Sequence, residues 1–248
     1  MEMKGMYLSE ITYEKAKEKL NENTIIVIPA GGGTKEHGSH LPLGTDMYVT
    51  QWIADKVTEK CNVITMPIVA YAYYPAFVNW EGSVSLEADT FINIMRDIIL
   101  SISRFGVKKF LIIDGGVSTH GPLKILSSDM RNKYNLKVAV TNILGLGHEV
   151  EQEVCEQQRG GHGDEGETSC MLHIRSDLVH MENAVEEYDE QISGTVKNGV
   201  VRVHLSSGMD TKSGVNGNST LATKEKGKRI LNAMAQDIID FIESYEKI

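Results

Sequence analysis

The chain has 248 residues, of which 41% are hydrophobic and 24% are charged, and its formal net charge is −9. This composition is typical of globular proteins and excludes disordered, collagen-like and low-complexity chains. The negative charge argues against nucleic acid or an anionic membrane as the main partner. No apolar run approaches the ~20 residues that a membrane helix needs.

The cysteines and the first residues of the chain bear on its compartment. Three cysteines, Cys61, Cys155 and Cys170, are few, odd in number and not in metal-type spacing. Residues 1–6 contain no apolar signal core. We therefore expect a cytoplasmic protein with reduced cysteines, and the lack of a long linker or repeat predicts a single domain over residues 1–248.

Short apolar runs alternate with amphipathic stretches over the first 145 residues. The runs predict strands over 24–29, 62–67, 109–113 and 137–142, and the amphipathic stretches predict helices over 47–60, 90–105 and 123–133. This alternation is typical of an α/β protein with a largely parallel sheet that is covered on both faces. Ligands of such sheets collect outside the carboxyl ends of the strands, so we expect the chemistry in the loops after Ile28 and Ile113.

The second half of the chain contains fewer clear elements. The pattern predicts a helix over 168–174, a hairpin over 196–205 that turns at Asn198-Gly199, a loop over 206–219 and a last helix over 224–245.

Polar side chains gather in the segment that follows the first predicted central strand. Glu36, His37, His40 and Asp46 lie within eleven positions of one another. Imidazole and carboxylate groups of this kind suit Zn, Mn or Fe in the +2 state. The alternative is a pair of hydrogen-bonded loop histidines, with Asp46 as the N-cap of the following helix.

A second polar cluster runs from His162 to Ser169 and is preceded by two glycines. In a functional interpretation a carboxylate of this cluster is a ligand or a base, and His162 carries a proton. In the alternative it is an acidic surface loop, with Glu167 in the first turn of a helix, where an acid favours the helix dipole.

A third cluster, Asp114 to Gly121, follows the strongest predicted strand and includes Ser118 and His120. Its glycines have neither the Walker spacing nor the GxGxxG spacing, so a phosphate loop has little support. His120 either faces the site or lies on the first turn of the next helix. The chain has no GxSxG motif and no cysteine beside a histidine, which argues against acyl-enzyme catalysis.

Five segments, in this order, resemble motifs of the creatininase (creatinine amidohydrolase) family. They are residues 29–46 (which contain the match to the family's EQHGPHLPLGTD), 82–86 (GTxSL), 114–123 (NGHGGNxxPL), 162–169 (HAGExETS) and 217–227 (GxPxxATxEKG). Together they extend over nearly the whole chain.

The resemblance implies a three-layer α/β/α domain, a homo-oligomer that is often hexameric, and two divalent metals bridged by an Asp. The metals would hold a hydroxide that attacks an amide carbon, often in a cyclic or formyl amide. His37 matches the family's ligand His, and Asp46, nine positions later, matches its bridging Asp. His162 matches the histidine of the third motif, and Glu167 matches the acid that precedes the Thr-Ser pair.

Three positions depart from the family pattern. Lys35 stands where the family has its first ligand Glu, and Gly116 stands where it has the histidine of NGH. Ser118 replaces a Glu of creatininase itself. Glu36 and His120 are the nearest residues that could replace the missing ligands.

These comparisons define the predicted site. The predicted metal ligands are Glu36, His37, Asp46, His120 and Glu167, and the predicted catalytic residues are His162 and Glu167. The predicted substrate contacts are Lys35, His40, Asp114 and Ser118. The site would hold one or two Zn, Mn or Fe ions per chain. The number is open because two neighbouring cations need several carboxylates to offset their repulsion, and Lys35 stands in place of one of these carboxylates.

The resemblance therefore predicts an amidohydrolase that cleaves a C–N bond of a small-molecule amide with metal-activated water. The altered positions leave an alternative open. In it the chain lacks the dinuclear site and acts as a small-molecule binding protein, or acts on an anionic substrate through Lys35.

Overall fold

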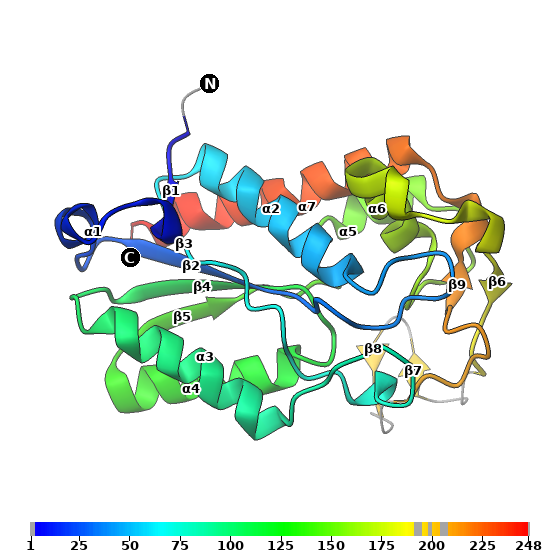
Figure 1. Ribbon diagram of the computed structural model, residues 1–248, viewed down its shortest axis with the longest axis horizontal. Helices are drawn as coiled ribbons and strands as arrows, with labels where there is room; N and C mark the ends of the chain where they lie inside the picture. The colour runs from blue at the N-terminus through cyan, green and yellow to red at the C-terminus, as the bar shows by residue number, and fades with distance from the viewer. Residues whose placement is uncertain (1–2, 191–194, 198–199, 204–207, 248) are drawn as a thin grey trace.

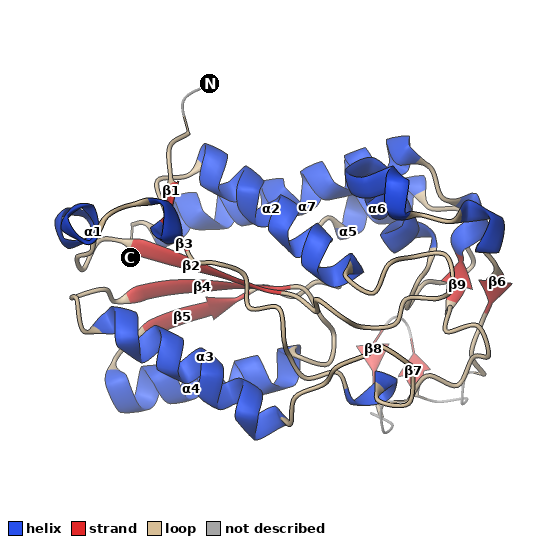
Figure 2. Ribbon diagram, viewed as in Figure 1, coloured by secondary structure: helices blue, strands red, loops and turns tan. Residues whose placement is uncertain are grey.

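The computed structural model describes residues 3–190, 195–197, 200–203 and 208–247. Its centre is a five-stranded sheet in which all neighbouring strands are parallel, in the order β1-β3-β2-β4-β5 (Figures 1 and 2). The strands are Met6–Tyr7 (β1), Ile25–Ala30 (β2), Ile64–Thr65 (β3), Lys109–Asp114 (β4) and Lys137–Val140 (β5). This confirms the predicted α/β class, although β3 is shorter than the predicted strand over 62–67.

Helices cover both faces of the sheet. Figure 1 shows α2 (Thr45–Lys60), α5 (His148–Val154), α6 (Glu165–Arg175) and α7 (Lys224–Tyr245) on one side, and α3 (Ala88–Ser103) and α4 (His120–Tyr134) on the other. Tyr13–Lys19 forms a further short helix, α1. The predicted helix over 224–245 has the same bounds as α7, whereas α1 and α5 were not predicted.

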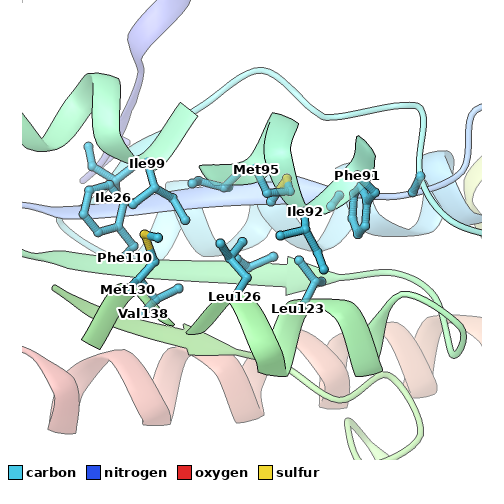
Figure 3. Packing of buried hydrophobic residues seen from close by; sticks show 14 of the residues in the cluster. Ile26, Phe91, Ile92, Met95, Ile99, Phe110, Leu123, Leu126, Met130 and Val138 are labelled. Carbon is cyan, nitrogen blue, oxygen red and sulfur yellow. The ribbon is translucent and has the colours of Figure 1, made fainter. Parts of the chain in front are cut away.

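The strands are apolar without interruption because both faces of the sheet are buried. Along β2, Ile26 and Ile28 pack with residues of α3 and α4, whereas Ile25 and Val27 pack with residues of α2 and α7. This alternation follows from the two-residue period of a strand. Figure 3 shows part of the first cluster, where the side chains of Phe91 and other α3 residues meet those of α4.

The strand order fixes where a site can form. From β2 the chain passes to β3 on one side, and β4 then pairs with β2 on the other side. The chain thus leaves β2 and β4 in opposite directions, and open α/β sheets usually bind ligands outside the carboxyl ends of such a pair of strands.

Two small antiparallel pairs complete the fold beyond that end of the sheet (Figure 2). Glu186–Glu187 (β6) pairs with Gly217–Asn218 (β9), and Val196–Lys197 (β7) pairs with Val200–Val201 (β8). The second pair falls within the predicted hairpin over 196–205, of which residues 198–199 and 204–205 lie outside the described residues. Single 3-10 turns occur at Leu8–Glu10, Pro75–Phe77, Ser176–Leu178, Met181–Asn183 and Ser219–Leu221. Within the described part of the chain, no helix combines the length and the apolar character that crossing a membrane requires.

Candidate active site

The loop after β2 is closed on itself and leads directly into α2. The backbone N–H of Lys35 donates to the carbonyl of Leu43 at 2.8 Å, and α2 begins at Thr45 with Gly44 as its N-cap. Asp46 lies in the first turn of α2 and is buried. The interpretation of Asp46 as the N-cap is therefore wrong, and its carboxylate is free to make other contacts.

Asp46 joins Lys35 and His37 in one buried cluster. The Lys35 ammonium lies 2.8 Å from Asp46 Oδ2, and His37 Nε2 lies 2.8 Å from Asp46 Oδ1. Burial opposes ionisation of the Asp46 carboxyl, but the charge of Lys35 and the contact with His37 prevail and lower its pKa. Asp46 is thus an ionised carboxylate with a different partner on each oxygen.

His37 has a fixed tautomer. Its Nδ1 lies 2.8 Å from the carbonyl oxygen of Lys35, which can only accept, so Nδ1 carries the hydrogen. Burial and the nearby Lys35 ammonium lower the pKa of the ring, which favours its neutral form. In the neutral ring Nε2 and Asp46 Oδ1, 2.8 Å apart, are both acceptors, so a shared proton or a cation is needed between them. A ring N–H bound to a backbone carbonyl, with the other nitrogen free, is the usual arrangement of a metal-ligating histidine.

His162 repeats this arrangement from the other half of the chain. Its Nε2 lies 2.7 Å from the carbonyl oxygen of Glu36 and 3.2 Å from the Glu36 carboxylate, so Nε2 is the donor and Nδ1 has the lone pair. Burial lowers the pKa of His162 to about 4. The rings of His37 and His162 lie 4.7 Å apart between centroids, so two neutral imidazoles stand side by side.

Glu167 faces His162 from the first turn of α6. This helix begins at Glu165, earlier than the sequence predicted, and the Asp164 side chain caps it by accepting from the backbone N–H of Glu167. Glu167 Oε2 accepts from the backbone N–H of Gly163 at 2.7 Å and lies 3.9 Å from His162 Nδ1. Burial and the carboxylates of Asp164 and Asp46 raise the pKa of Glu167 to about 8, although Lys35 opposes this.

These side chains fit a divalent cation. Among the described residues, His37, His162 and Glu167 each offer a ligand atom, and these atoms lie within 4.8 Å of one another. A cation bound beside His37 would give the lone pair of that ring a partner and would offset the negative charge that contributes to the raised pKa of Glu167. Imidazole nitrogens with carboxylate oxygens are a donor set that suits Zn, Mn or Fe.

Glu36 contacts the loop backbone and the His162 ring and is not one of the three residues, His37, His162 and Glu167, that could hold a cation. Its backbone N–H donates to Ser83 Oγ at 2.9 Å, and its carboxylate accepts from the backbone N–H of Gly38 and contacts His162. Both carboxylate oxygens thus have partners at the loop backbone and at the His162 ring. The predicted role of Glu36 as a metal ligand stays a prediction.

Three other predicted residues lie outside the cation group. His40 Nε2 lies 2.8 Å from Thr168 Oγ1, so this buried ring ties the loop to α6. His120 is the first residue of α4, and its Nδ1 lies 3.4 Å from Asp114 Oδ2. Ser118 is half-buried in the loop between β4 and α4. The predicted roles of these residues as ligands or substrate contacts stay predictions.

Asp114 ends β4 and is fully buried. Its Oδ1 accepts from Thr119 Oγ1 and from the backbone N–H of Gly116. Burial raises its pKa to about 7, and the negative charge of Asp46 adds to the rise. Because β2 and β4 are parallel, Asp114 at the end of β4 and Asp46 after the loop that leaves β2 lie at the same end of the sheet.

Sequence reasoning missed the aromatic wall of the site. Tyr74 and Phe77 flank the Lys35 ammonium, whose nitrogen lies 5.1 and 5.0 Å from their ring centroids. Phe77 also lies 4.5 Å from the His162 ring. The available signal was the run Tyr71 to Phe77, in which three tyrosines and a phenylalanine surround a proline.

Comparisons with known proteins agree with this geometry. The profile of the creatininase family, described as creatinine amidohydrolase, matches residues 9–242. The chain belongs to the creatininase family. A solved structure of creatinine amidohydrolase superimposes with a TM-score of 0.82 at 21% identity and covers 98% of both chains, which shows a shared fold.

Two curated relatives show the range of named activities in the family. The chain is 24% identical to 3-dehydro-scyllo-inosose hydrolase of Thermotoga maritima, over 96% of this chain and 82% of that one. It is 22% identical to creatinine amidohydrolase of Pseudomonas putida, over 96% of both chains. Two further structural neighbours are titled as a Mn form and as a Zn-Zn type of creatininase.

Proposed function

We propose that this protein is a metal-dependent hydrolase that cleaves a C–N bond of a small, cyclic or formyl, amide. The observation that carries the proposal is the pair of neutral histidines, His37 and His162. Each ring donates its N–H to a backbone carbonyl, which leaves its other nitrogen beside a carboxylate, that of Asp46 or Glu167. Two curated relatives support the class of reaction, because they are named creatinine amidohydrolase and a formylamino-pyrimidine deformylase.

Each residue of the group has a distinct task. His37 Nε2, Asp46 Oδ1 and the Glu167 carboxylate would hold the cation, which when bound lowers the pKa of a water molecule and polarises a carbonyl group. His162 Nδ1 lies beside Glu167 and is neutral at pH 7, so it can accept a proton from the attacking water. The same atom then returns the proton to the leaving nitrogen.

The surroundings of the group keep this chemistry in order. The carbonyls of Lys35 and Glu36 hold the two rings in one tautomer each, and Phe77 covers His162 with an apolar face that excludes water. Zn and Mn are the cations we propose, since both occur in the titles of creatininase neighbours. We also propose that the protein is cytoplasmic and that it forms a homo-oligomer. Light scattering after gel filtration would measure the size of the oligomer.

Metal content is the first test. The purified protein, stripped with a chelator and reloaded with Zn²⁺ or Mn²⁺, should retain metal after gel filtration. The variants His37→Ala and Asp46→Ala should lose it, whereas His148→Ala, at an exposed position on α5, should not. The wild type and His148→Ala should also release amine from a panel of lactams and formamides, whereas His37→Ala and Asp46→Ala should not. Unchanged metal content in both site variants would refute the proposal.

A further inference from the structure

Among the described residues, His37, His162 and Glu167 form the group that could hold a cation, and no second such group lies on the other side of Asp46. The family resemblance implies two cations bridged by an Asp, and Asp46 has two oxygens in different surroundings. Oδ1 faces the His37 ring, but Oδ2 faces the Lys35 ammonium at 2.8 Å. An ammonium has no lone pair, so Lys35 cannot bind a metal while it is protonated.

The place of the missing family histidine is filled by another side chain. A Cβ atom on Gly116 would lie 2.9 Å from Tyr74 Cε1, and a Cβ atom on Gly32 would lie 2.8 Å from Tyr74 Cε2. The phenol head of Tyr74 is therefore clamped between two glycines, from the loops after β2 and β4. A histidine at position 116 has no room beside it.

Tyr74 and Lys35 both present unused donors at this place. The Tyr74 hydroxyl is buried and has no hydrogen-bond partner among the described residues. The Lys35 nitrogen has one carboxylate within 4.0 Å in the described part of the chain, that of Asp46, while its other sides face the rings of Tyr74 and Phe77. A fixed positive charge with spare N–H and O–H donors is suited to bind an oxygen that carries negative charge.

We propose that Lys35 and Tyr74 take the place of the second cation, so that Asp46 joins one divalent ion to one ammonium. The inference rests on the proposed metal dependence and deepens it. A substrate oxygen that a second cation would bind meets the ammonium and the phenol instead. Lys35 supplies one positive charge where a metal would supply two, which matches the loss of the family's glutamate at the same position.

Metal stoichiometry tests the inference without a substrate. Titration of the stripped protein with Mn²⁺ should saturate at one ion per chain, and the electron paramagnetic resonance spectrum should be that of isolated Mn²⁺. The triple variant Lys35→Glu, Gly116→His, Tyr74→Ala restores two ligands and the room for them. It should bind two ions per chain and give a spin-coupled spectrum.

The outcomes separate this inference from the function on which it rests. Two ions or a coupled spectrum in the wild type would overturn the inference while leaving metal-dependent hydrolysis intact. A single ion in the folded triple variant would also overturn it. No binding at all in the wild type would refute the proposed function itself.

A single substitution keeps the inference testable if the triple variant does not fold. Lys35→Met removes the charge but keeps an apolar side chain between the two rings. If the ammonium competes with a divalent ion for Asp46, the affinity for Mn²⁺ should rise by about tenfold or more. Unchanged or weaker binding in folded Lys35→Met protein, judged by circular dichroism, would contradict the role of the ammonium.

Discussion

Two buried aspartates at the same end of the sheet have opposite ionisation behaviour. Asp46, at the start of α2, has a lowered pKa because Lys35 and His37 prevail over burial. Asp114, at the end of β4, has a pKa that burial raises to about 7, since its partners are a hydroxyl group and a backbone N–H. The comparison teaches that the neighbouring ammonium decides between these two aspartates, because Asp46 has one beside it and Asp114 does not.

The loops around these aspartates differ in the same way. The loop after β2 provides the side chains of Lys35, Glu36 and His37, whereas the loop after β4 contributes mainly backbone and space. A Cβ atom on Gly115 would lie 2.0 Å from Thr50 Oγ1, so the second loop packs directly against α2. The loop after β2 supplies the charged side chains, and the loop after β4 leaves room for Tyr74 to approach Lys35.

Removing the cation of Asp46 should have the largest effect on stability. Lys35→Met leaves the Asp46 carboxylate buried without its ammonium, and breaking a buried pair in this way costs about 3–5 kcal/mol. Urea unfolding in the presence of a chelator measures the loss. Lys56→Met, which breaks a surface pair with Glu59, is the control and should cost less than about 1 kcal/mol. Equal losses in the two variants would show that Asp46 does not depend on Lys35.

Neutralising Asp114 should have a smaller effect that depends on pH. The folded pKa, about 7, lies above the value of 3.8 for an unperturbed Asp, so this residue costs stability as the pH rises from about 4 to 7. Asp114→Asn removes that cost and keeps an acceptor for Thr119. Its unfolding free energy should exceed that of the wild type by about 3–4 kcal/mol more at pH 8 than at pH 4, because each unit of raised pKa corresponds to about 1.4 kcal/mol.

Urea unfolding at the two pH values checks this prediction. Asp210→Asn makes the same chemical change at an exposed position and serves as the control. A difference between Asp114→Asn and the wild type that is the same at both pH values would contradict a raised pKa.

Filling the space beside Tyr74 should have the smallest effect of the three. In Gly116→Ala the new methyl group would lie 2.8 Å from Thr119 Oγ1 and 2.9 Å from Tyr74 Cε1, and overpacking of this kind costs about 1–2 kcal/mol. Gly116→Ala should cost less stability in a protein that already has Tyr74→Ala than it costs in the wild type. Thermal unfolding of all four proteins gives the coupling between the two positions. Additive effects would mean that Tyr74 is not what restricts position 116.

Periodicity predicted the elements that bury most of their surface. The apolar runs of β2 and β4 and the amphipathic pattern of α7 have clear periods, and their positions were predicted within a few residues. Two short helices were missed. Tyr13–Lys19 and His148–Val154 have seven residues each and no fully buried side chain, so they lack an apolar stripe.

The site was only partly predictable because its contacts are long-range. His37 and Asp46 lie nine positions apart, so motif and spacing brought them together. Tyr74 contacts Gly32 and Gly116 because separate loops pack together, and no local sequence pattern predicts such a contact. The residue types at 35 and 116 showed that something had changed, but only the fold shows that one phenol ring accounts for the glycine at position 116.

The bond from His162 to the Glu36 carbonyl has a consequence for how the protein acquires its activity. It joins residues 126 positions apart, and all neighbouring strands of the sheet are parallel, so its strand pairings close large loops of chain. Such topologies fold slowly. A cation held by His37 and Glu167 needs residues from both ends of this span, so it could bind only after the chain between them has folded. If the protein binds metal as proposed, the rate of metal uptake would report on the completion of folding.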